Sequence, residues 1–124
     1  MKNYSRQREA ILKVLRSTDV HPTASEVYKR VKEQIPNISL GTVYRNLSAL
    51  SSAGDILTIS VGEGSDHFDG NAAPHLHLHC RCCGRIADMN YDFSKALKQI
   101  DNLGFKSETS VLVIHGVCKS CNRL

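Results

Sequence analysis

The sequence lacks an apolar stretch of membrane length, an N-terminal secretion signal and a lipidation motif. It also contains no internal repeat and no low-complexity tract. Charge of one sign is not in strong excess, because 16 Lys and Arg stand against 12 Asp and Glu, so net charge does not identify a partner. We expect a cytoplasmic protein that has no membrane partner.

Cysteine is present in an odd number, five, in a chain without a secretion signal. Metal binding is then favoured over disulfides. Four of the five form two Cys-x-x-Cys pairs, a spacing that supplies the ligands of a tetrahedral zinc knuckle. These ligands are Cys80, Cys83, Cys118 and Cys121. We predict about one structural Zn²⁺ per chain; Cys82 has no partner pair and is interpreted as a spare thiol.

The N-terminal half has the pattern of a winged helix-turn-helix. A helical stripe around residues 11–15 is followed by a capping box, Thr23 to Glu26, and by a third helix that starts at Ser39 and ends before Gly54. Strands are predicted over 56–61 and 66–69, joined by a turn at 62–65. We assign residues 1–69 to a DNA-binding domain and 70–74 to a hinge.

Residues 75–124 read as a small α/β domain, which makes the whole chain α+β. Strands are predicted over 76–80, 85–90 and 111–117, with a helical stripe behind Asp92 that ends at Gly104. Such a unit leaves a sheet edge exposed, and pairing with a second copy would satisfy it. We therefore expect a dimerisation domain and a homodimer.

A second group of possible metal ligands precedes the first cysteine pair, in the segment His75-Leu-His77-Leu-His79. Strand alternation places these three histidines on one face. Nitrogen ligands combined with carboxylates suit Fe²⁺ or Mn²⁺ better than an all-thiolate set does. His79 is either a ligand or a neighbour of this site, and the remaining histidines His67 and His115 are interpreted as ordinary surface residues.

Three ordered motifs resemble the ferric uptake regulator family: His21-Pro-Thr-Ala-Ser-Glu-Val-Tyr28, Ser39-Leu-Gly-Thr-Val-Tyr-Arg-Asn-Leu47, and His75-x-His77-x-x-Cys80-x-x-Cys83-Gly. The resemblance covers roughly residues 5 to 122. It implies a homodimeric, metal-dependent transcriptional repressor that binds an inverted repeat in double-stranded DNA and takes no small organic substrate.

Within that family the pattern looks most like the peroxide-responsive repressors, because both matched carboxylates are Asp. Members of that branch bind one regulatory ion per chain, Fe²⁺ or Mn²⁺. Three histidines and two carboxylates coordinate this ion. Matched by motif, these are His21, Asp69, His75, His77 and Asp88. The resemblance implies that peroxide causes oxidation of a ligand imidazole, here His21 or His75. A further histidine-rich site of the family is incomplete, since Leu76 stands at an acidic position.

The third helix supplies the predicted DNA contacts. A helix N-terminus with small hydroxyls suits phosphate, and an arginine can pair with guanine through two hydrogen bonds. The candidates are Ser39, Thr42, Tyr44, Arg45 and Asn46. Arg45 also favours an alternative, an iron- or manganese-responsive repressor of metal uptake without peroxide sensing, because this position resembles the iron-type members.

Two other classes are compatible with parts of the pattern. Histidines with aspartates could form the site of a metallohydrolase that activates water, although the chain offers no nucleophile motif. A zinc-stabilised adaptor without a DNA role would explain the cysteines but not the helix-turn-helix. We therefore expect a regulator and not an enzyme.

Overall fold

The computed structural model describes residues 2–18, 20–62 and 64–122. The chain divides into two compact units, Met1–Ala72 and Ala73–Leu124, which we call the helical unit and the sheet unit. The fold class is α+β, a winged helix-turn-helix followed by a small α/β domain with a cysteine knuckle, as predicted. In the described ranges, no helix combines the length and the apolar composition needed to cross a membrane.

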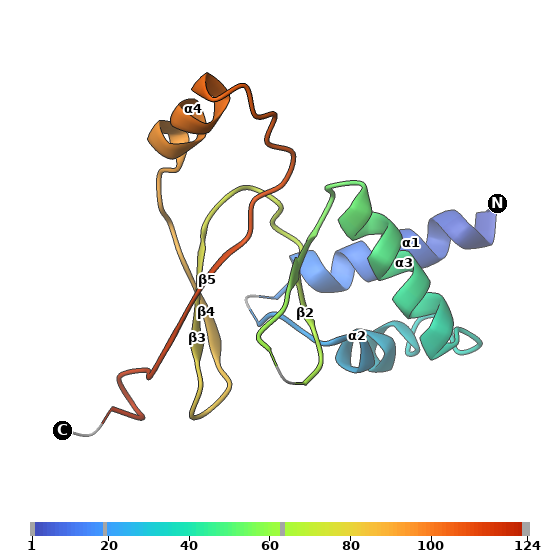
Figure 1. Cartoon of the computed structure of the whole chain (residues 1–124). Coiled ribbons are helices and arrows are strands. Elements are labelled where there is room, and N and C mark those ends of the chain that lie inside the picture. Colours follow the sequence, from blue (N-terminus) through green and yellow to red (C-terminus); the bar gives the residue numbers. More distant parts are fainter. Residues whose placement is uncertain (1, 19, 63, 123–124) are drawn as a thin grey trace. The chain divides into compact units, whose positions relative to one another are not determined.

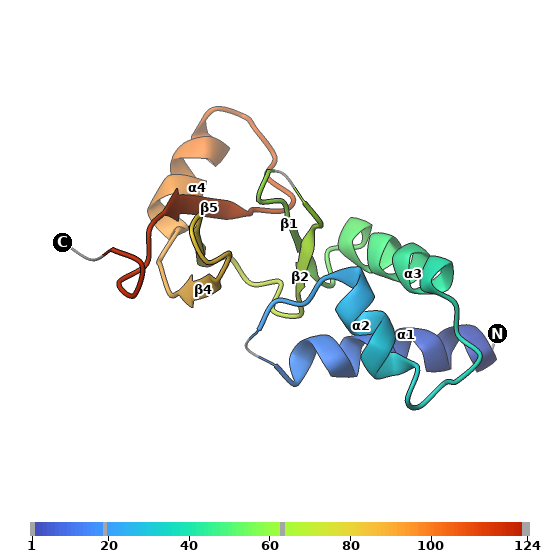
Figure 2. The same ribbon diagram turned by 90° about the horizontal axis from the view of Figure 1, so that it is seen from below.

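The helical unit consists of three helices and a two-stranded ribbon (Figures 1 and 2). Its elements are α1 (Lys2–Arg16), α2 (Ala24–Val31), α3 (Leu40–Ser52), β1 (Leu57–Ile59) and β2 (His67–Asp69). The strands pair antiparallel, with Leu57 opposite Asp69, and are shorter than the predicted 56–61 and 66–69. In the predicted turn, Gly62 and Gly64 have positive φ angles, and residue 63 lies outside the described residues.

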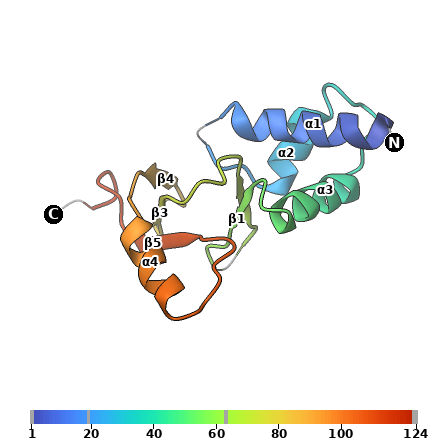
Figure 3. The same ribbon diagram turned by 90° about the horizontal axis from the view of Figure 1, so that it is seen from above.

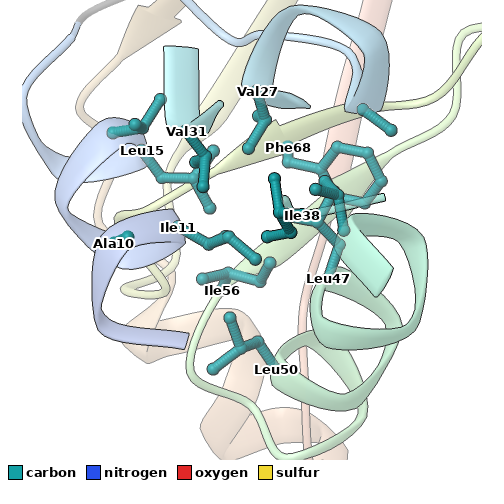
Figure 4. Close-up of a cluster of buried hydrophobic side chains, with 13 residues drawn as sticks. Ala10, Ile11, Leu15, Val27, Val31, Ile38, Leu47, Leu50, Ile56 and Phe68 are labelled. Atoms are coloured by element: carbon teal, nitrogen blue, oxygen red, sulfur yellow. The ribbon is translucent and has the colours of Figure 1, made fainter. Parts of the chain in front are cut away.

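One hydrophobic core joins the three helices to the ribbon (Figure 4). Ile11 of α1 and Leu47 of α3 are fully buried, and Phe68 of β2 packs in the same cluster. Burial of such side chains contributes about 1.5–3 kcal/mol each. Because Phe68 precedes Asp69 directly, the core that fixes α3 also fixes the end of β2.

Local signals set the helix ends as the sequence predicts. The Thr23 hydroxyl accepts a hydrogen bond from the Glu26 N–H, and the Glu26 carboxylate accepts one from the Thr23 N–H, which completes the capping box. Ser39 caps α3 by accepting from the Thr42 N–H. Gly54, with φ of 81°, follows α3 in the left-handed conformation that ends helices.

The sheet unit has three strands in the order β4-β3-β5 and one helix (Figure 3). They are β3 (Leu76–Cys80), β4 (Ile86–Met89), α4 (Ser94–Asn102) and β5 (Leu112–Gly116). β3 pairs antiparallel with β4 and parallel with β5. The bounds of β3 match the prediction, whereas β4 and β5 are each one residue shorter at both ends than the predicted 85–90 and 111–117.

The N-terminus of α4 lies slightly later than the pattern predicts. Asp92 accepts a hydrogen bond from the Ser94 N–H, but the N-cap position itself is Phe93, which makes no side-chain cap bond. Hydrogen bonds from the hydroxyl and the N–H of Ser94 hold the pKa of Asp92 below its usual range.

Few apolar side chains of the sheet unit are buried. Among its described residues, Leu76 and Cys80 are the buried apolar positions, and no residue of α4 is buried. Nine of the twelve exposed large apolar side chains among the described residues lie in this unit. The strands therefore need support beyond their own packing.

We predict that Thr23→Ala destabilises the helical unit by about 1 kcal/mol, because the Glu26 N–H loses its acceptor. Chemical denaturation followed by circular dichroism measures the change. The matched control is Ser25→Ala, an exposed position in the same helical turn, which should leave stability nearly unchanged. Equal effects of the two substitutions would contradict a role for the capping box.

Candidate metal centres and nucleic-acid interface

The four predicted cysteines converge in the sheet unit. The Sγ atoms of Cys80, Cys83, Cys118 and Cys121 all lie within 4.8 Å of one another. The Cys83 and Cys118 sulfurs are 3.8 Å apart, the edge of a tetrahedron with metal–sulfur bonds of about 2.3 Å. The last residue of β3 and the turn that follows it supply the first pair, and the segment after β5 supplies the second. The donor set fits zinc, and Cys82 is exposed outside the cluster.

The thiols in this cluster have strongly different acidities. Backbone hydrogen bonds, the largest from the Cys118 N–H, lower the pKa of Cys80 to about 5. Contacts with the other cysteine side chains, Cys118 first, raise the pKa of Cys121 to about 12. A bound metal therefore has to displace the proton of Cys121, whereas Cys80 gives up its proton more readily.

Two of the predicted regulatory ligands meet within the helical unit. His21 precedes the cap of α2, and Asp69 ends β2; both are about 5% exposed. His21 Nδ1 lies 3.8 Å from Asp69 Oδ2, beyond hydrogen-bond distance but within reach of one ion with bonds of about 2.1 Å to each. The Asn71 N–H donates to the other oxygen of Asp69 at 2.9 Å and fixes that carboxylate.

The backbone around His21 is tied to β2. The ring Nδ1 of His67 lies 2.6 Å from the carbonyl of His21 and must donate, because a carbonyl only accepts. The Phe68 N–H donates to the Pro22 carbonyl at 3.0 Å, and Thr23 forms a bridge with His67. The interpretation of His67 as an ordinary surface residue was wrong: it positions a predicted ligand. No spacing rule in the sequence marks this role.

The other three predicted ligands meet within the sheet unit. His75 Nε2 and His77 Nε2 lie 3.1 and 3.5 Å from Asp88 Oδ1. Antiparallel pairing places His77 directly opposite Asp88. The Ala73 carbonyl accepts from His75 Nδ1 at 2.8 Å, which fixes the ring with Nε2 toward the carboxylate. Two imidazoles and a carboxylate thus converge, as divalent transition-metal sites require.

His79 does not join this group. Although strand alternation predicts it on the same face as His77, its Nδ1 lies 3.0 Å from His115 Nδ1 on β5. His75 lies just before β3 rather than in it. The direction of its side chain is therefore set by the hydrogen bond to the Ala73 carbonyl and not by the strand alternation.

The predicted DNA-reading helix begins with a network of hydroxyl groups. Ser39 Oγ and Thr42 Oγ1 are 2.9 Å apart, and Arg45 Nη2 donates to Thr42 Oγ1 at 3.0 Å. A Cβ on Gly41 would lie 3.3 Å from Arg45 Nη1, so this glycine leaves room for the guanidinium. Tyr44 is 48% exposed. These side chains form a polar surface on the first turns of α3.

Asn46 requires a correction. It is 3% exposed, and its Nδ2 donates to the Thr42 carbonyl at 2.9 Å. It therefore faces the interior of the helical unit and does not present its amide to DNA. Helical spacing alone placed it beside Arg45, but the packing of α3 against the core turns it inward.

These features define a winged-helix protein with a cysteine metal knuckle and further nitrogen and oxygen ligands. The chain belongs to the ferric uptake regulator family, whose sequence model matches residues 2–115. Members of this family are metal-responsive transcription regulators and not enzymes.

The chain is 38% identical over 120 residues to the peroxide-responsive repressor PerR of Staphylococcus aureus strain USA300, covering 93% of this chain and 79% of that protein. The crystal structure of the Campylobacter jejuni peroxide stress regulator has a TM-score of 0.79 at 29% identity, covering 96% of this chain and 91% of that one. The Vibrio cholerae ferric uptake regulator has a TM-score of 0.66 at 27% identity, covering 90% and 88%. Its crystal structure reveals a structural rearrangement of the DNA-binding domains.

We predict that the purified protein retains about one zinc per chain and that Cys118→Ser loses it, because a closed tetrahedral site opens when one thiolate is removed. Loss of zinc should also unfold the sheet unit or lower its melting temperature. Metal analysis and thermal denaturation measure both effects.

The matched control is Cys82→Ser, which removes the exposed thiol that lies between Cys80 and Cys83. It should keep its zinc and its stability. A folded Cys118→Ser protein with full zinc content would refute the assignment, and zinc loss in Cys82→Ser would reassign the ligands.

Proposed function

We propose that this protein is a homodimeric, metal-dependent repressor that releases an inverted-repeat operator when peroxide oxidises a ligand histidine. The observation that carries the proposal is the pair of ligand groups described above. One is His21 with Asp69, and the other is His75 and His77 with Asp88. All five are imidazole or carboxylate ligands of the kind that Fe²⁺ and Mn²⁺ bind, and within each group the ligand atoms already lie close together.

We propose further that both groups hold the same ion. The two groups belong to different compact units, so one ion bound by both would fix the angle between those units. In a dimer this angle determines the separation of the two α3 helices, which must match the half-site spacing of the DNA. The rearranged DNA-binding domains of the Vibrio cholerae relative support such an adjustable angle.

Dimerisation is supported by the apolar surface of the sheet unit. Leu112 and Ile114 of the edge strand β5 are 46% and 51% exposed. An edge strand with exposed apolar residues is a template for pairing with another chain. A second copy would cover this edge and place two recognition helices about a two-fold axis.

For DNA binding, the surface of α3 supports four of the predicted contacts. Ser39 and Thr42 lie at the helix N-terminus, where hydroxyls and the helix dipole favour phosphate. Tyr44 and Arg45 are exposed on the next turn. Arg45, held by Thr42, is the candidate for reading guanine.

The peroxide response is supported by similarity to the two peroxide regulators. Iron, when bound, supplies the reduction of hydrogen peroxide. One oxygen atom of the peroxide is added to an imidazole, at His21 or His75, and the other leaves as water. The modified ring is a poorer ligand, so the metal-dependent angle is lost and the repressor dissociates.

A second candidate function is favoured by Arg45, whose identity resembles iron-type members of the family. In that case the same ligands sense iron or manganese supply, and the protein controls metal uptake without peroxide chemistry. The DNA-binding step is common to both candidates, so only the response to peroxide separates them.

We predict that DNA binding requires Fe²⁺ or Mn²⁺ and weakens steeply with salt, because several phosphates are neutralised. Arg45→Ala should cost about 1–3 kcal/mol on the specific site and little on random DNA. Anaerobic fluorescence anisotropy with both duplexes measures this difference. The control is Lys29→Ala, which removes an exposed positive charge of α2 that is not a predicted DNA contact. Equal losses of Arg45→Ala on both duplexes would reduce Arg45 to a phosphate contact.

For the peroxide response, we predict one added oxygen on His21 or His75 after a low dose of peroxide, in the iron form only. Mn²⁺ does not readily reduce hydrogen peroxide in this way. The manganese form should therefore stay on DNA with unmodified histidines. Peptide mass spectrometry and DNA binding, measured on the same samples, test this. An iron form that stays bound and unmodified would favour the second candidate function.

A further inference from the structure

A pair of histidines outside both metal centres lies across the two parallel strands of the sheet unit. His79 of β3 and His115 of β5 are register partners. Their Nδ1 atoms are 3.0 Å apart, and the rings meet edge to face with centroids 5.1 Å apart. His79 is half-buried and His115 is exposed, so solvent reaches the pair. Neither residue has a role in the proposed repressor function.

The geometry of this pair is close to that of two imidazoles on one metal ion. A tetrahedral ion with metal–nitrogen bonds of about 2.0–2.1 Å separates its two nitrogen ligands by roughly 3.3 Å. The two Nδ1 atoms, which are 3.0 Å apart, would need to move apart only slightly to reach this separation. The ion would take the position between the two nitrogens, in place of the hydrogen bond that now joins them.

We propose that His79 and His115 form a further metal site, open to solvent, that binds a divalent transition-metal ion such as Zn²⁺. Imidazole nitrogen suits zinc, copper and nickel, and water would complete the coordination of the ion. With two protein ligands, the site binds more weakly than the four-cysteine cluster. It exchanges its ion with the medium, whereas the cysteine site keeps its own.

The location of the site gives it a mechanical effect. His79 precedes Cys80 directly, and His115 lies three residues before Cys118. An ion held by both histidines would therefore join the same two strands that the cysteine cluster joins. Because an ion that binds only the folded state stabilises it, this second link raises the stability of the sheet unit as free zinc rises.

The test is a Zn²⁺ titration of protein that has retained its cysteine-bound zinc, followed by nitrogen NMR of the histidine rings. The ring signals of His79 and His115 should shift together and saturate with one common affinity. His79→Gln or His115→Gln should weaken this binding by about tenfold or more, because the second imidazole no longer acts at high effective concentration. Cys82→Ser, which removes the remaining thiol of this unit, should leave the titration unchanged.

The proposal is wrong if the two rings do not respond to Zn²⁺ up to about 1 mM. It is also wrong if both glutamine variants bind as tightly as the parent, or if Cys82→Ser abolishes binding. Should a variant fail to fold, the parent protein decides the question through chemical modification by diethyl pyrocarbonate. Zn²⁺ should protect His79 and His115 together, and modification of both at an unchanged rate overturns the site.

Discussion

The sheet unit depends on the convergence of four cysteine sulfurs more than on hydrophobic packing. Its described residues bury few apolar side chains, and α4 buries none. The cluster brings the end of β3 and its following turn to the segment after β5, across a long connection that contains β4, α4 and β5. Closing such a connection is entropically costly without a cross-link. A metal bound by these cysteines would hold β3 and β5 in the parallel register that aligns His79 with His115.

In the helical unit the constraint is different, because hydrophobic packing fixes the site. Phe68 of β2 lies in the hydrophobic core that the three helices share. Through His67 and Phe68, the strand bonds to the backbone of His21 and Pro22. The predicted ligand pair, His21 and Asp69, is thereby supported by the same hydrophobic core as α3. Such support is what a site needs if a small change at the metal is to move a distant helix.

Much of this architecture could be predicted from sequence because its signals are local. The capping box at Thr23, the cap at Ser39 and the bounds of β3 follow from neighbouring residues, and the two cysteine pairs follow from ligand spacing. The errors concern side-chain direction, which tertiary packing decides. Asn46 turns into the core although helical spacing puts it beside Arg45. The roles of His67 and His79 required knowledge of which strands lie side by side, and sequence periodicity does not contain that information.

The spacing of the cysteine pairs has a consequence for how the protein is made. The 34 residues between Cys83 and Cys118 take roughly 2–7 s to synthesise. During this interval the first pair has emerged without the second, and no closed site protects its thiols. Exposed thiolates are the forms of cysteine that oxidants attack. The thiols of a newly made chain are therefore open to oxidants until Cys118 and Cys121 have been added and all four cysteines can hold a metal.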